Sequence, residues 1–236
     1  MRAARRVAVL TGAGISAESG VPTFRDAQTG LWARYRPEEL ATPEAYTRNP
    51  RMVWEWYEWR RSLVARARPN AGHYALAALE ARVPQFMLIT QNVDGLHHES
   101  GSRNVLELHG NIRRNKCFEH NHPVERWQDT GEVPPRCPQC GGRLRPDVVW
   151  FGEMLPEAEL ARALATVGRC DVFLSVGTST VVEPAASMPF AALRFGAVVV
   201  EINPTETPLS RQAHHVLRGA SGEVLPALVA AAWPAQ

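Results

Sequence analysis

A histidine that directly follows an apolar run is the first residue of this chain whose position indicates acid–base chemistry. The run 105–108 is typical of a buried strand, and His109 and Gly110 come directly after it. Histidine exchanges its proton closest to neutral pH, so it is the side chain best suited to act as a general base there. Proteins with parallel sheets place reactive groups at the carboxyl ends of their strands. His109 is thus a candidate catalytic base, although a histidine taken alone is more often a surface or capping residue.

A glycine-rich turn follows another apolar run near the start of the chain. After residues 7–11 the sequence reads Gly12-Ala13-Gly14-Ile15-Ser16-Ala17, a Gly-x-Gly-x-x-Ala pattern between a strand and a helix start. Such turns bring backbone amides close to a pyrophosphate, so a nucleotide is expected here, with a ligand-free turn as the alternative. The usual continuation of a dehydrogenase, a second strand with an acidic residue about 20 positions further on, is missing. Hydride transfer is therefore disfavoured.

A cluster of cysteine and histidine residues predicts a metal site. Cys137 and Cys140 form a tight Cys-x-x-Cys pair, and Cys117, His120 and His122 precede it. In a chain without a recognisable export signal, this spacing favours thiolate metal ligands over disulfides. Cys117, His120, Cys137 and Cys140 are predicted to bind one structural zinc, with His122 as an alternative to His120. The other interpretation is a vestigial site in which packing alone holds the loop.

The elements that must position these residues alternate along the chain. Short apolar runs predict strands over 7–11, 86–90, 105–108, 171–176, 197–202 and 215–217. Most of these runs are continuously apolar, which is typical of strands covered on both faces of a parallel sheet. Helical patterns lie between them over 50–66, 71–81, 156–167, 185–195 and 222–232. The order predicts an α/β fold with a doubly wound parallel sheet.

Two stretches, 22–70 and 113–147, interrupt this alternation and resemble insertions that build a smaller helical and zinc-binding module. The expected organisation is one catalytic domain over residues 1–236. Its sheet-bearing part covers about 1–24, 71–112 and 150–236, and its small domain covers about 25–70 and 113–149. A cleft between the two parts is the expected place for a ligand.

Composition limits the partners of this protein. With 45% hydrophobic and 21% charged residues, the chain is typical of soluble globular proteins. Its net charge of +2 is too small to favour nucleic acid or a membrane as a partner. No apolar run approaches the roughly 20 residues that span a bilayer. We expect a cytoplasmic monomer.

Short motifs along nearly the whole chain, from about residue 7 to about residue 230, resemble those of the sirtuin family. They occur in the family's order and approximate spacing, and they are Gly12-Ala13-Gly14-Ile15-Ser16, Phe24-Arg25-Asp26, Thr90-Gln91-Asn92-Val93-Asp94, Leu108-His109-Gly110, the run from Pro146 to Glu153, Gly177-Thr178-Ser179 and Ile202-Asn203-Pro204. The resemblance implies a Rossmann-like NAD domain, a small zinc-bearing module and an acyl-lysine tunnel between them. Sirtuins usually carry a second Cys-x-x-Cys in the metal module, so the histidine at position 120 is a departure.

The implied activity is the NAD-dependent removal of acyl groups from lysine side chains of other proteins. In sirtuins the amide oxygen attacks the nicotinamide ribose at its anomeric carbon, and nicotinamide leaves. A base then deprotonates a ribose hydroxyl, and the acyl group ends on ADP-ribose. The resemblance makes His109 that base and places Asn92 in the catalytic centre with it.

The resemblance also assigns NAD contacts. Phe24 and Arg25 belong to the family's cofactor loop, where Arg25 meets the phosphates and Phe24 covers the reactive ribose. Asn92 and Asp94 belong to the nicotinamide-ribose and carboxamide pocket, and Gln91 lies beside the ribose hydroxyls; a helix-capping polar turn is the alternative for these three. The remaining contacts come from turns after other strands, namely Gly12, Ala13, Gly14, Ser16, Gly177, Thr178 and Ser179, with Asn203 at the adenosine ribose and the backbone of Ala220 at adenine.

Two further segments are expected to bind the acylated substrate. The stretch with Val149, Phe151 and Gly152 resembles the edge that pairs with an extended peptide, with a buried strand end as the alternative. Tyr57 and Arg60 are three residues apart, so they share a helix face. They resemble the Tyr-x-x-Arg of the sirtuin class that accepts succinyl- and malonyl-lysine, because a phenol and a guanidinium together suit a carboxylate. Acetyl-lysine is expected to be accepted as well.

Two other functions are compatible with the same motifs. One is an NAD-dependent protein mono-ADP-ribosyltransferase, against which His109 and the Tyr57/Arg60 pair weigh. The other is a non-catalytic NAD sensor. Product analysis separates all three, because only a transferase leaves ADP-ribose on protein.

Overall fold

A six-stranded parallel sheet forms the centre of the protein. The computed structural model describes residues 1–22 and 36–234. The strand order is β3-β2-β1-β7-β8-β9, and every pairing is parallel. The bounds are Arg6–Thr11 for β1, Gln85–Thr90 for β2, Val105–Glu107 for β3, Val172–Val176 for β7, Val198–Ile202 for β8 and His215–Leu217 for β9. The predicted doubly wound α/β fold is confirmed.

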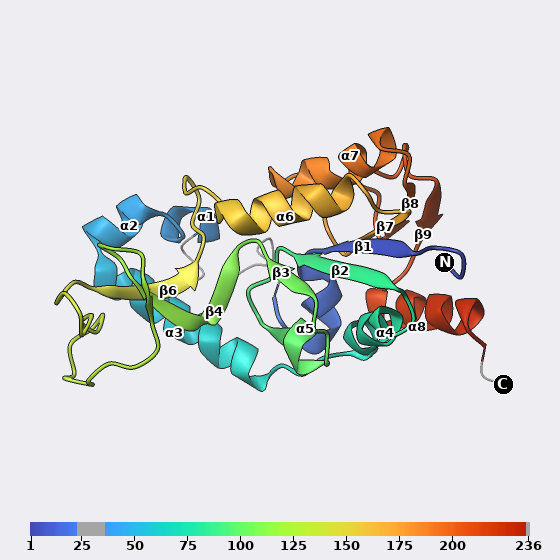
Figure 1. Ribbon diagram of the computed structural model, residues 1–236. Coiled ribbons are helices and arrows are strands. Elements are labelled where there is room, and N and C mark those ends of the chain that lie inside the picture. The colour runs from blue at the N-terminus through green and yellow to red at the C-terminus, as the bar shows by residue number, and fades with distance from the viewer. Residues whose placement is uncertain (23–35, 235–236) are drawn as a thin grey trace.

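Helices cover both faces of this sheet (Figure 1). Val7 and Val9 of β1 pack in a core with helices α4 (Ala71–Glu80) and α8 (Ser221–Ala232). Ala8 and Leu10 of the same strand pack in a second core with α6 (Glu157–Val167) and α7 (Met188–Arg194). Successive strand residues point to opposite faces, so a strand with two covered faces is apolar throughout.

A smaller module lies beyond one end of the sheet (Figure 1). It contains α1 (Pro37–Leu40), α2 (Pro43–Arg48) and α3 (Pro50–Arg66). It also contains a three-stranded antiparallel sheet of order β5-β4-β6, with β4 at Gly110–Cys117, β5 at Pro123–Val124 and β6 at Leu144–Val148. The sequence analysis predicted an insertion here but no strands. These strands are short and polar, and the β4–β6 register shifts between Asn111 and Asn115, so no regular alternation marks them.

Local signals explain why α3, which carries the Tyr57/Arg60 pair, forms where it does. The Asn49 side chain accepts a hydrogen bond from the amide of Met52 at 3.1 Å, and Pro50 stands in the first turn. The helix buries Trp56 and Tyr57 against β4 and β6. The predicted helix over 185–195 is instead divided into a 3-10 turn, Ala185–Ser187, and α7. The glycine-rich turn leads into another 3-10 segment, Ala13–Ser19, and α5 is a single short turn at Leu96–Glu99.

The helices of the described residues include none with both the length and the apolar character needed to cross a membrane.

Candidate active site

The ends of β1 and β7 meet at the point where the chain order of the sheet reverses. Strands β2 and β3 continue to one side of β1, and β7, β8 and β9 to the other. In open α/β sheets ligands bind at such a switch point. The amide of Gly12 donates to the carbonyl of Val176 at 3.1 Å, and that of Gly14 donates to Gly177 at 2.8 Å. The two turns predicted to contact NAD are therefore joined to each other.

Glycine is required in both turns because their backbones touch. A Cβ atom on Gly14 would lie 2.7 Å from the Gly177 Cα atom. A Cβ atom on Gly12 would lie 2.9 Å from Thr178, and one on Gly177 would lie 2.5 Å from the amide of Ile15. Gly177 also has a φ of +58°, which favours glycine. The glycines therefore let the two turns, called the glycine cradle below, pack directly on each other at the switch point, where the sequence predicts NAD to bind.

A buried polar cluster lies behind the first turn. Ser16 donates to a carboxylate oxygen of Asp94 at 2.7 Å and accepts from the Asn92 side chain at 3.1 Å. Asp94 also accepts from the amide of Leu96 at 2.9 Å. Burial raises the pKa of Asp94, although its hydrogen bonds with Leu96 and Ser16 oppose that rise. The structure thus brings together Ser16, Asn92 and Asp94, three residues named separately from the sequence.

Two buried histidines that the sequence analysis did not single out adjoin this cluster. His73 Nε2 lies 3.4 Å from the Ser16 hydroxyl, and His97 Nε2 lies 2.9 Å from the Thr11 hydroxyl. Their rings lie 4.9 Å apart. Burial lowers the pKa of His73 to about 4, and burial with repulsion from its histidine neighbours lowers that of His97 well below its usual range. Both rings are therefore neutral near pH 7. The sequence did contain a local signal for His73. Asn70 is the N-cap of α4, and His73 at position N3 completes a capping box with it.

The predicted base, His109, is held by one of its two ring nitrogens. Its Nδ1 lies 2.9 Å from the carbonyl oxygen of Gln91. A carbonyl oxygen only accepts, so Nδ1 carries the hydrogen of the neutral ring and Nε2 has the lone pair. Burial lowers the pKa of His109, and its bond to Gln91 partly opposes this. The ring is therefore in the form that can accept a proton at neutral pH.

Residues predicted to hold the ribose groups are joined by Thr178. Gln91 donates to the Thr178 hydroxyl at 2.9 Å, and the Asn203 side chain donates to the Thr178 carbonyl at 2.9 Å. Ala220 stands directly before α8, and Glu18 accepts from the amide of Gly222 in the first turn of that helix at 2.7 Å. These strand ends and the start of α8 surround the glycine cradle. Ala13 and Ser179 lie within the two turns themselves, whereas Phe24 and Arg25 lie outside the described residues.

The predicted acyl receptor lies in the small module, with Tyr57 buried and Arg60 partly buried. Tyr57 is 2% exposed, and the indole Nε1 of Trp150 donates to its hydroxyl oxygen at 2.9 Å. Burial raises the pKa of Tyr57 to about 12, so the phenol is protonated at neutral pH. Burial lowers the pKa of Arg60, which nonetheless stays charged because a guanidinium is too basic to lose its proton in a protein. The Arg60 guanidinium lies 5.1 Å from the centre of the Trp56 ring.

The predicted peptide edge runs from the end of β6 towards α6. The amide of Val149 donates to the carbonyl of His109 at 2.9 Å, and that of Phe151 donates to Ala41 at 2.9 Å. Within the described part of the chain, the amide of Gly152 has no recorded hydrogen-bond partner. Any peptide pairing here must therefore use other groups than the Val149 and Phe151 amides. The bond to His109 ties this segment to the predicted base.

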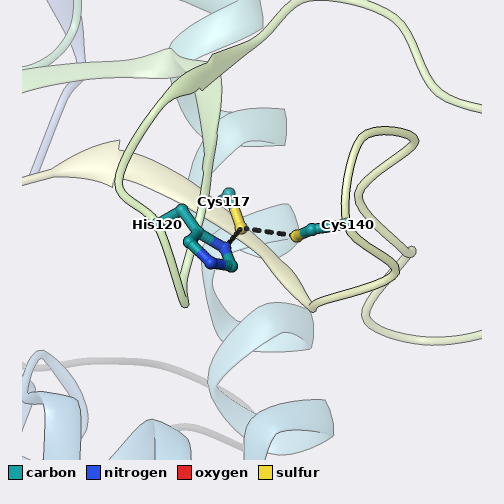
Figure 2. A group of neighbouring side chains, drawn as sticks. All are labelled: Cys117, His120 and Cys140. Carbon is teal, nitrogen blue, oxygen red and sulfur yellow. Dashed lines mark hydrogen bonds between the residues drawn. The ribbon is translucent and has the colours of Figure 1, made fainter.

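The five metal-ligand candidates form two neighbouring groups of three that share Cys117, the last residue of β4. Figure 2 shows Cys117, His120 and Cys140 converging, and Cys117 also groups with His122 and Cys137. Their donor atoms lie within 4.8 Å of one another in each group. The Cys117 and Cys140 sulfurs are 3.5 Å apart, Cys117 lies 3.9 Å from His120 Nδ1, and Cys137 lies 3.2 Å from His122 Nε2.

These separations fit a zinc ion. Tetrahedral zinc holds two thiolate sulfurs about 3.8 Å apart, and a sulfur and an imidazole nitrogen about 3.5 Å apart. The donors are also of the soft thiolate and imidazole types that zinc takes in structural sites. Five donors are present for four positions, so the structure leaves both histidines as candidates for the fourth ligand.

The switch-point turns and the polar cluster define a nucleotide-binding α/β protein, and comparisons with known proteins identify its family. A model of the Sir2 family matches residues 12–184. A relative from Aquifex aeolicus, named NAD-dependent protein deacylase, is 56% identical over 208 residues, which are 88% of this chain and 87% of the relative. The chain belongs to the Sir2 family, as its motifs predicted.

Solved structures agree with this assignment. A Sir2 homologue in complex with NAD matches with a TM-score of 0.91 and 50% identity, over 98% of this chain and 90% of that chain. A triple mutant of a Sir2 homologue in complex with 2'-O-acetyl ADP ribose matches with a TM-score of 0.90 and 49% identity, over 98% and 93% of the two chains.

Proposed function

We propose that this protein is an NAD-dependent protein-lysine deacylase that removes succinyl and malonyl groups as well as acetyl groups. Membership of the Sir2 family and relatives named as NAD-dependent protein deacylases support the reaction class. The observation that carries the proposal is the state of His109, whose Nδ1 is bonded to Gln91 and whose Nε2 has the lone pair of a base. His109 is linked to the second turn through Gln91, whose side chain donates to Thr178, and its position just after a strand suits that role.

NAD, when bound, supplies the ADP-ribose that accepts the acyl group and releases nicotinamide. The chain's own groups bind and orient it, and one of them accepts a proton. The Gly12 and Gly177 turns lie at the switch point of the sheet, where phosphates are expected, and Ser16, Asn92 and Asp94 offer a fixed polar wall for the ribose. His109 removes a proton from a ribose hydroxyl, which is the step that general base catalysis speeds by about 10²–10⁴-fold.

The acyl preference follows from the Tyr57/Arg60 pair. Tyr57 is buried and Arg60 is partly buried, so a carboxylate that reaches them exchanges part of its solvation for a phenol and a guanidinium. A succinyl or malonyl group carries that carboxylate at its far end, whereas an acetyl group has none. The pair therefore supports a preference for acidic acyl groups without excluding small ones.

The structural zinc is proposed to hold the small module together. Four protein ligands leave no open position on the ion, so it takes no part in the chemistry. The substrates are proteins that carry acylated lysine, and we retain the cytoplasm and a monomeric state as expectations.

The test is a mass-spectrometric assay with NAD on matched acetyl-lysine and succinyl-lysine peptides. His109→Ala should abolish formation of O-acyl-ADP-ribose from both peptides, and His215→Ala, which alters an exposed histidine, is its control. Arg60→Met should lose succinyl activity far more than acetyl activity. Arg51→Met on the same helix, whose side chain is 70% exposed, is the matched control.

The outcomes separate the alternatives. Absence of deacylation with either peptide would contradict the proposal, and ADP-ribose left on protein would favour the transferase. Deacetylation without any succinyl activity would leave the Sir2 reaction intact and remove the carboxylate receptor.

A further inference from the structure

The hydrogen bond between Trp150 and Tyr57 determines which way the Tyr57 hydroxyl can donate. An indole N–H donates and never accepts, so at 2.9 Å the Tyr57 oxygen must be the acceptor. The phenol O–H lies near the ring plane, in one of two directions, and Trp150 occupies one of them. In the described part of the chain the Tyr57 hydroxyl has no second recorded partner. Its hydrogen is therefore directed to the other side, where no described group is recorded as accepting it.

Trp150 is itself held rigidly, so this direction is stable. Its ring is 2% exposed, and the Arg145 guanidinium lies 3.2 Å from the ring centre. Its amide donates to Glu153 at 2.7 Å, and Arg145 donates to the same carboxylate at 2.9 Å. The Tyr46 ring packs against it at a centroid distance of 5.2 Å. These contacts hold the indole in the orientation in which its N–H meets Tyr57.

We propose that Trp150 is a positioning residue for acyl selectivity, which turns the Tyr57 hydroxyl hydrogen towards the carboxylate of a succinyl or malonyl group. This inference rests on the proposed carboxylate receptor. Without the indole N–H, the phenol can rotate and donate elsewhere, and the receptor loses part of its preorganisation. Arg60 continues to attract the carboxylate, so the selectivity falls without disappearing.

The experiment compares kcat/KM for succinyl-lysine and acetyl-lysine peptides in the wild type, Trp150→Phe, Tyr57→Phe and the double variant. Trp150→Phe keeps an aromatic ring and removes the N–H donor, together with the volume of one fused ring in a buried position. Its succinyl-to-acetyl ratio should fall about tenfold, the size of one hydrogen bond to a charged group. In the Tyr57→Phe background the same change should leave the ratio within about twofold, because the hydroxyl it acts through is gone. Trp127→Phe, in the metal module, controls for a general tryptophan-to-phenylalanine effect.

A merely structural role gives a different result. In that case Trp150→Phe lowers both activities by the same factor, or its effect adds to that of Tyr57→Phe, and either result overturns the inference. If wild-type protein removes acetyl but not succinyl groups, the carboxylate receptor itself fails. If Arg60→Met loses succinyl selectivity and Trp150→Phe does not, only the role of Trp150 fails.

An independent measurement covers the case in which Trp150→Phe does not fold. Tyr57→Phe removes the acceptor and keeps the indole, so the indole N–H resonance of one buried tryptophan should move upfield in the ¹H–¹⁵N spectrum. A succinyl-lysine peptide should shift the same resonance in the wild type, because a carboxylate that accepts from Tyr57 makes its oxygen a stronger acceptor. If neither change moves a tryptophan N–H resonance, the inference is wrong.

Discussion

Replacing Glu153 by glutamine should destabilise the protein more than replacing its partner Arg145 by methionine. Arg145 donates to Glu153 at 2.9 Å and to the carbonyl of Val148 at 2.7 Å. The two side chains differ in exposure, at 3% for Arg145 and 24% for Glu153. Glu153→Gln leaves a guanidinium charge that water cannot reach, whereas Arg145→Met leaves a carboxylate that can reach water.

The magnitude follows from this difference in burial. Removing one partner of a buried ion pair costs about 3–5 kcal/mol. Because Glu153 is partly exposed, we expect about 3 kcal/mol for Glu153→Gln. For Arg145→Met we expect about 1–2 kcal/mol, mainly the lost bond to Val148 and the lost pairing at Glu153. For a chain of this size, 1 kcal/mol corresponds to about 2–4 °C in Tm, so the first variant should melt about 10 °C below the wild type.

The assay is urea unfolding followed by tryptophan fluorescence, at neutral pH and at acid pH. Burial acts to raise the pKa of Glu153, but its hydrogen bond and charge interaction with Arg145 outweigh burial and hold that pKa below the ordinary 4.5. A carboxyl group with a lowered folded-state pKa stabilises the protein above the unfolded value and loses that contribution as pH falls through the folded value. The difference between wild type and Glu153→Gln should therefore narrow below pH 4.5. Equal or reversed destabilisation of the two variants at pH 7 would refute the reasoning.

Three further predictions concern the cradle, the base and the metal. Gly14→Ala places a methyl group 2.7 Å from the Gly177 Cα atom, so calorimetry should show NAD binding weakened at least about tenfold; unchanged binding would contradict the close contact. Because burial lowers the pKa of His109 below 6.5, the acidic limb of kcat/KM should have its midpoint below pH 6.5, and a midpoint above that value would remove His109 as the base. Either histidine can serve as the fourth ligand, so the His120→Ala and His122→Ala proteins should each retain close to one equivalent of zinc, measured by mass spectrometry of metals. The double variant should lose its zinc. Complete loss in one single variant would show that only that histidine is a ligand.

The strands and their chemistry were predictable because they depend on short contiguous patterns. The run 86–90 is almost continuously apolar, and the polar residues Gln91, Asn92 and Asp94 follow it. This order can be read without knowing how the rest of the chain folds. The same is true of the glycine turn after β1 and of His109 after β3. Boundaries differed from expectation by a residue or two, since end residues depend on local hydrogen bonds rather than on pattern.

The small antiparallel sheet was not predicted, for a physical reason. Strand β4 carries Arg113, Arg114 and Lys116 and meets β6 through a register shift at Asn115, so neither strand alternates regularly. Its stability comes from packing against α3 and from side chains such as Arg61, which donates to the carbonyl of Ile112 at 2.6 Å. Such contacts leave no local signature.

The sequence by itself determined the family, the doubly wound sheet and the identity of the candidate base, because each depends on residues adjacent along the chain. The tertiary structure decided which of these residues act together. Ser16 meets His73 and Asp94, and Trp150 meets Tyr57, only after the chain has closed loops of 57, 78 and 93 residues. The entropy lost in closing those loops is offset by burial of the apolar cores of the sheet and the small module. Residue spacing along the chain does not predict which distant side chains then come into contact.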